Sequence, residues 1–133
     1  MSSEKEYSVG LKLIVKSDTK ESEILKFLGI VNEYLEKVEL NEGGFLWSVD
    51  SGIEQSGSLD EHLSALSLKL GKNLKAVQIK PVFLEKIYLS VGVFYKTYTC
   101  TTLLPPESLV KLYSLFPYME VEICSYPTSD EEG

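Results

Sequence analysis

The chain has 133 residues, the length of a single domain, and its 13 basic and 20 acidic residues leave a formal net charge of −7. All the basic residues are lysines, which excludes a site built on a guanidinium fork, and the acidic balance argues against nucleic-acid binding. No apolar run approaches the roughly 18 residues of a membrane-spanning helix, and the start of the chain lacks signal-peptide features. We therefore expect a cytoplasmic protein that does not bind a membrane.

The first elements follow from periodicity. Residues 7–16 alternate apolar and polar side chains, which predicts a strand with one buried face. Asp18 and Glu21 have the spacing of a helix cap, and the short apolar stripe that follows ends at Gly29, a residue suited to terminate a helix.

Residues 31–42 fit two interpretations. Apolar residues at helical spacing favour an amphipathic helix, which is the preferred interpretation: Val31, Tyr34, Leu35 and Val38. The alternative is a short strand around Val38 before a turn at Gly43 and Gly44.

The rest of the chain alternates strands with helices. Residues 45–50, 87–98 and 119–124 have strand periodicity. Ser58 and Glu61 form a capping box that opens a helix to Leu70, and the proline pair at 105–106 opens another before Pro117. Residues 74–79 fit either a turn of helix or a strand-like link.

This order consists of two β-α-β halves joined by a central helix. It predicts an α+β fold: a two-layer, ferredoxin-like sandwich of a mainly antiparallel sheet with helices on one face. We expect one domain over residues 1–128 and a disordered acidic tail at 129–133. The polar face of the sheet is left for solvent or a partner.

The sequence contains few residues of the types that act in catalysis. His62 is the only histidine, and no second histidine or cysteine stands near it in sequence to complete a metal or catalytic site. Cys100 and Cys124 have no basic neighbour that would activate a thiol. We therefore expect no catalytic residues, metal ligands or cofactor.

Charge is distributed unevenly. Residues 31–66 hold eight acidic residues and one lysine, so this stretch carries a charge equal to that of the whole chain. Such a stretch is either a solvated surface or a docking surface for a basic protein. The candidate partner-binding residues combine these acids with two aromatic residues: Glu33, Tyr34, Glu36, Glu39, Glu42, Trp47, Asp50, Glu54, Asp60 and Glu61. The alternation around Trp47 favours a place in the core instead.

Six segments resemble the bacterial domain of unknown function numbered 4279. They are Tyr7-Ser8-Val9-Gly10-Leu11, Glu23-Ile24-Leu25 with Leu28-Gly29, Trp47-Ser48-Val49-Asp50-Ser51, Leu59-Asp60-Glu61-His62-Leu63 with Leu70, Pro106-Glu107-Ser108-Leu109, and Met119-Glu120-Val121-Glu122-Ile123. The resemblance implies a compact α+β domain with no assigned reaction.

In overall profile, the chain is also similar to immunity proteins of contact-dependent or polymorphic toxin systems. The expected function is therefore a non-enzymatic one, the binding and neutralisation of a basic toxin domain, such as a nuclease, by a monomer or weak dimer. One alternative is a small-ligand or enzymatic domain that uses His62 with Asp50 or Asp60. Another is an interaction module that self-associates through the open sheet face.

Overall fold

The computed structural model describes residues 5–40, 45–70, 79–96 and 103–128. In chain order its elements are β1 (Lys5–Val15), α1 (Glu21–Leu28), the 3-10 turn η1 (Asn32–Tyr34), β2 (Glu36–Glu39), β3 (Phe45–Asp50), α2 (Leu59–Leu70), β4 (Leu84–Tyr95), α3 (Pro106–Leu115) and β5 (Glu120–Pro127). The expected tail at 129–133, Cys100 and most of the link at 74–79 lie outside the described residues.

The five strands form one mixed sheet in the order β2-β3-β1-β4-β5. β1 is central and pairs antiparallel with both β3 and β4, and β2 pairs antiparallel with β3. β5 runs parallel to β4, because the α3 crossover returns the chain in the same direction. The α+β class is confirmed, and the sheet is mainly rather than wholly antiparallel.

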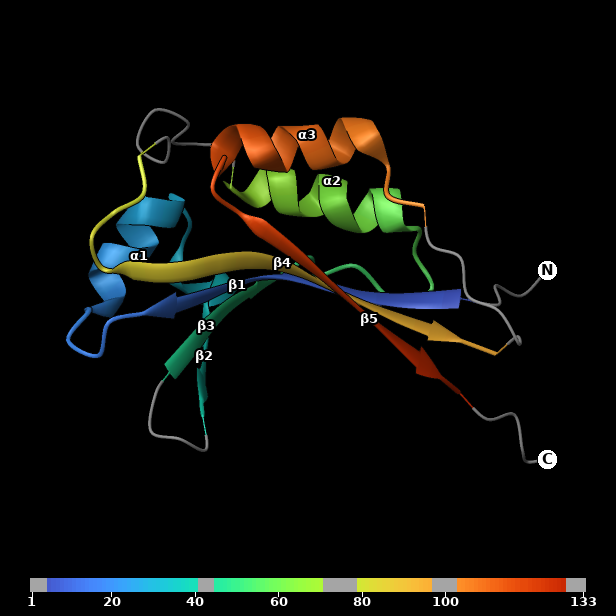
Figure 1. The fold of residues 1–133 in the computed structure, drawn as a ribbon, viewed down its shortest axis with the longest axis horizontal. Helices are drawn as coiled ribbons and strands as arrows, with labels where there is room; N and C mark the ends of the chain where they lie inside the picture. Colours follow the sequence, from blue (N-terminus) through green and yellow to red (C-terminus); the bar gives the residue numbers. More distant parts are fainter. Residues whose placement is uncertain (1–4, 41–44, 71–78, 97–102, 129–133) are drawn as a thin grey trace.

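The core lies between one face of this sheet and the helices. The alternating residues of β1 that face the helices, Val9, Leu11 and Leu13, are buried against the leucine stripe of α2. α2 and α3 lie side by side over the sheet, and α1 covers one end (Figure 1). Phe27 of α1 packs against the rings of Phe83 and Phe116. The opposite face of the sheet has no helix over it among the described residues.

Two helix ends follow the sequence closely. Ser58 and Glu61 form the expected capping box: the Glu61 N–H donates to the Ser58 hydroxyl (3.1 Å), and the Ser58 N–H donates to the Glu61 carboxylate (2.8 Å). Gly29 ends α1 with a φ of 68°, in the left-handed region that side chains other than glycine disfavour.

Two local predictions are wrong. Over residues 31–40, the described part of the stretch 31–42, the chain is not a helix: it makes η1 and then the edge strand β2, so the alternative of a short strand around Val38 is the correct one. The apolar residues of that stretch bury little surface (Val31 is 51% and Tyr34 is 45% exposed), so pairing with β3 prevails over helical periodicity. The start of α1 also differs, because the N-cap is Lys20 rather than Asp18, and its N–H donates to the Glu23 carboxylate at 3.2 Å.

Candidate functional site

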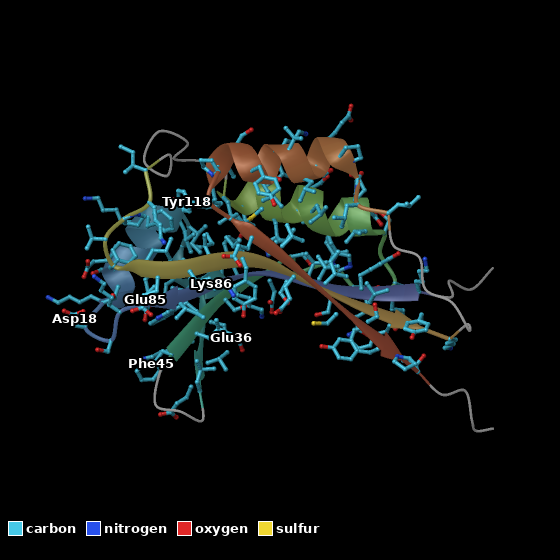
Figure 2. All side chains as sticks on the ribbon, viewed as in Figure 1. Asp18, Glu36, Phe45, Glu85, Lys86 and Tyr118 are labelled. Carbon is cyan, nitrogen blue, oxygen red and sulfur yellow. The ribbon has the colours of Figure 1, made fainter. Side chains whose placement is uncertain are left out.

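A cleft of about 380 Å³ lies where the start of β2 meets the end of β3. It is lined by Glu33, Tyr34, Leu35, Glu36, Ser48, Asp50, Gly52 and Lys69, and we call it the acidic cleft. Four of the ten residues expected to bind a partner line it. They converge because the β2–β3 register sets Glu36 opposite Ser48, two residues before Asp50 on the same face of the strand. Figure 2 shows Glu36 on the side of the sheet away from α2 and α3.

Lys69, from the last turn of α2, places its ammonium group in this cleft. The Nζ atom donates to the backbone carbonyls of Asp50 (2.8 Å) and Ser51 (3.0 Å), and it lies 4.9 Å from the centre of the Tyr34 ring. Gly52 makes room for it, because a Cβ there would lie 2.9 Å from Nζ, and its φ of 78° also favours glycine. The cleft therefore already holds one ammonium group, bound by carbonyl oxygens and an aromatic ring.

The carboxylates of the cleft are not neutralised by that lysine. Within the described parts of the chain, no ion pair joins Glu33, Glu36 or Asp50 to a lysine. The Asp50 carboxylate accepts a hydrogen bond from the Ser48 hydroxyl (3.2 Å), which in turn accepts one from Lys12 Nζ (2.9 Å). All three acidic residues are exposed to solvent.

A second cavity of about 340 Å³ lies beside the acidic cleft and shares Asp50 and Gly52 with it. His62 lines its wall and is only 1% exposed. Its Nδ1 atom lies 2.7 Å from the Ser51 hydroxyl, and the ring makes an edge contact with Tyr7. Burial lowers the pKa of His62, although the Glu54 carbonyl and the Glu61 carboxylate act in the opposite direction. The imidazole is therefore neutral at pH 7.

The acidic partners considered for His62 are occupied elsewhere. Asp60 accepts a hydrogen bond from the Ser108 hydroxyl, and Asp50 accepts one from Ser48. Nε2 of His62 is buried with no hydrogen-bond partner among the residues described. The structure therefore supplies a Ser–His contact without the carboxylate that would orient the imidazole as a general base.

The remaining candidates are scattered. Glu39 lies exposed on β2, and Glu54 lines the second cavity. Asp60 and Glu61 belong to the first turn of α2, where each already makes a hydrogen bond within the chain. Glu42 lies outside the described residues.

The prediction that Trp47 contacts a partner is wrong, because its side chain is buried. It is 5% exposed and lies in the core on the helix side of β3, as its alternation with Phe45 and Val49 indicates. The aromatic residue available at the acidic cleft is Tyr34.

Three residues of the two cavities carry no functional signal in the sequence: Lys69, Ser48 and Ser51. The helix dipole alone favours a lysine in the last turn of a helix, so the position of Lys69 in the sequence does not indicate a role in a site. Its role depends on α2 ending next to the C-terminus of β3, which no local pattern reveals.

Within the described residues, no three histidine, cysteine or carboxylate side chains gather as a metal site, and no helix is long and apolar enough to cross a membrane. Cys124 is a free thiol on β5. A scan against protein-family models finds no match. Searches of curated proteins and of solved structures find none either.

Proposed function

We propose that this protein is a non-enzymatic binding protein that captures a basic partner protein at the acidic cleft. Its most concrete form is a cytoplasmic immunity protein that occludes a toxin domain, such as a nuclease. One observation carries the proposal: three exposed carboxylates, Glu33, Glu36 and Asp50, surround a site that already binds an ammonium group.

Electrostatics supports a role in protein capture more than one in small-ligand binding. A field from clustered carboxylates accelerates the encounter with a basic protein, whereas each exposed ionic contact contributes only about 0–1 kcal/mol. Tyr34 supplies an amphipathic ring of the kind that carries binding energy at interfaces, and it is 45% exposed. The cleft therefore combines a source of fast association with an anchor.

Two finer expectations belong with this proposal. We regard the two-layer arrangement as a variant of the ferredoxin-like sandwich, with β2 added at one edge and β4 and β5 paired directly and in parallel, and the resemblance to domain of unknown function 4279 as a family relationship. Both are supported by the helices that cover one sheet face and by the places of the resembling segments on β1, α1, β3, α2, α3 and β5. We expect a monomer or weak dimer in the absence of the partner.

Co-expression with the product of the adjacent reading frame tests the function. We expect the two proteins to copurify, and we expect this chain to protect cells from the neighbour's toxicity. A variant with Glu33→Lys, Glu36→Lys and Asp50→Lys should lose both effects.

The matched control carries Glu6→Lys, Glu85→Lys and Glu122→Lys, three exposed acids outside the cleft that change the net charge by the same amount. This control should retain binding and protection. Equal loss in both variants would show that bulk charge, not the acidic cleft, recruits the partner. Failure of the wild-type chain to copurify with or protect against the neighbour would refute the immunity function.

A further inference from the structure

β2 is an open sheet edge. It pairs with β3 on one side only, and it is the outermost strand in the sheet order. All four of its residues are exposed, and among the described residues none lies against its outer side as a further strand. Alternate N–H and C=O groups of such a strand point outward and are able to pair with another extended chain.

The usual protections of an edge are weak here. Proline, a bulge or an outward lysine commonly prevents edge pairing, and β2 contains only Lys37. Its Nζ atom lies 3.8 Å from the centre of the Phe45 ring and 5.3 Å from that of Trp47, so the side chain folds back over β3. The outer edge is therefore not guarded by its one cation.

At the opposite edge of the sheet, side chains of β5 are engaged in contacts with β4. Glu120 forms an ion pair with Lys86 (3.7 Å), and Tyr126 stacks on Phe94 with ring centres 5.2 Å apart. Glu36 of β2 has no such partner among the described residues and opens into the acidic cleft. β5 also carries the exposed acid Glu122, so what favours a cationic strand at β2 is the cleft that Glu33, Glu36 and Asp50 line at its start.

We propose that the partner contributes an extended basic segment that pairs with the outer edge of β2 and inserts a lysine or arginine side chain into the acidic cleft. This inference rests on the proposed function and specifies its binding mode. Main-chain hydrogen bonds to β2 supply affinity, and the side chains that alternate along the segment supply specificity.

The faces of β2 define the side-chain pattern of that segment. Glu36 and Val38 share the open face of the sheet, whereas Glu39 and Lys37 share the helix face. A segment with a cation beside Glu36, an apolar residue beside Val38 two positions away and a second cation near Glu39 matches both faces. A second copy of this chain fits poorly, because it presents the same acidic edge.

A soluble seven-residue peptide, blocked at both ends, serves as the probe; its lysines at the second and fifth positions and valines at the third and fourth give this pattern in either strand direction. Binding is followed by backbone amide shifts of the whole protein, with hydrogen exchange read at β2 and β5. We expect the shifts to centre on β2 and its amides to exchange at least tenfold more slowly. Shifts centred on β5 would overturn the proposal.

Two methylated peptides separate strand pairing from simple charge attraction. Each keeps all its lysines, but one is N-methylated on the odd and the other on the even residues, so that only one loses the N–H groups facing β2. One set should weaken binding at least tenfold and the other less than twofold. Equal affinity of all three peptides, or equal loss in both methylated forms, overturns the proposal.

Substitutions complete the design. Glu36→Lys should weaken peptide binding at least tenfold, whereas Glu122→Lys on β5, with the same change in charge, should alter it less than twofold. Equal effects of the two would overturn the proposal.

Copurification with the neighbouring gene product distinguishes a failure of the proposed function from a failure of the proposed strand pairing. If that partner binds without protecting the β2 amides from exchange, the proposed function stands and strand pairing is refuted. If peptide pairing succeeds but no basic partner copurifies, the proposed function fails while the edge preference of β2 is retained.

Discussion

The Ser51 hydroxyl and the Nδ1 atom of His62 lie 2.7 Å apart in a buried contact that ties the residue after β3 to the first turn of α2. The Ser51 oxygen also accepts the N–H of Ile53 (3.3 Å), so a single hydroxyl fixes both the turn and the imidazole. Removing it leaves a buried nitrogen without a partner. We expect Ser51→Ala to lower the free energy of unfolding by about 1–3 kcal/mol in urea titrations.

The buried imidazole makes stability depend on pH. Because burial lowers the pKa of His62 below its ordinary 6.5, the unfolded chain binds a proton more readily than the folded one. The stability that the neutral, buried His62 contributes to the folded state is fully present above pH 6.5. It declines as the pH falls from 6.5 toward the pKa of His62 in the folded state. Between about pH 8 and 5.5, urea unfolding of the wild type should show this decline, and His62→Gln should show a flatter profile. Parallel profiles would mean that another group is responsible.

Gly29 should be more sensitive to substitution than Gly92. Alanine at Gly29 must adopt the φ of 68° that ends α1, which costs about 1–2 kcal/mol. At Gly92 a Cβ would make only ordinary contacts, 3.6 Å from the Ser8 carbonyl oxygen and from the Tyr126 ring. Thermal unfolding should therefore give a clearly lower Tm for Gly29→Ala and a change within about 0.5 kcal/mol for Gly92→Ala. Equal loss at both positions would show that the left-handed backbone is not the cause.

Tyr34 and Trp47 should separate binding from folding. Tyr34→Ala removes an exposed ring, so partner affinity should fall at least tenfold while the free energy of unfolding changes by less than about 1 kcal/mol. Trp47→Ala opens a hole in the core and should cost about 3–5 kcal/mol. Calorimetry of binding and chemical denaturation measure the two effects. A Tyr34→Ala variant that binds normally would exclude this ring as an anchor.

Charge reversal near β2 should act on the rate of association. With Glu36, Glu39 and Glu42 all changed to lysine, we expect the association rate constant to fall at least tenfold at low salt and its salt dependence to flatten. The reason is that steering by exposed charges is screened within about 8 Å at physiological salt. Stopped-flow measurements over a range of salt concentrations provide the check. An unchanged rate would move the docking surface to the open sheet face around Lys12, Ser90 and Glu122.

The sequence predicted those elements whose signals are local. The period-two runs of β1, β3 and β4, the leucines of α2 and the Ser58–Glu61 box each contain enough information in a few residues. The strand β2 was only the second choice from sequence, because its four residues acquire strand geometry by pairing with β3. The apolar residues of this stretch have the spacing of an amphipathic helix, but they are half-exposed. They bury too little surface to stabilise a helix.

The candidate site was predictable only in part for the same reason. Local charge density picks out Glu33, Glu36 and Asp50, but it cannot distinguish them from Asp60 and Glu61, which cap α2 or bind Ser108. Lys69 reaches the cleft from a helix that is distant in sequence, and Ser51 meets His62 across the β3–α2 connection. Such convergence is a property of the packed layers, and no short window of sequence contains it.

The central place of β1 has a consequence for synthesis. It is made before the other strands of this sheet, yet its pairing with β4 joins Lys5 to Tyr95, so one edge of β1 stays unmatched until β4 has been made. At about 5–20 residues per second, the interval is roughly 5 to 18 s. During that time its apolar residues Val9, Leu11 and Leu13 are covered only as α1 and then α2 are made, or by a chaperone, and the β4 edge of the strand stays open. A nascent chain stalled before β4 should accordingly be a chaperone substrate, and one released after β4 should not.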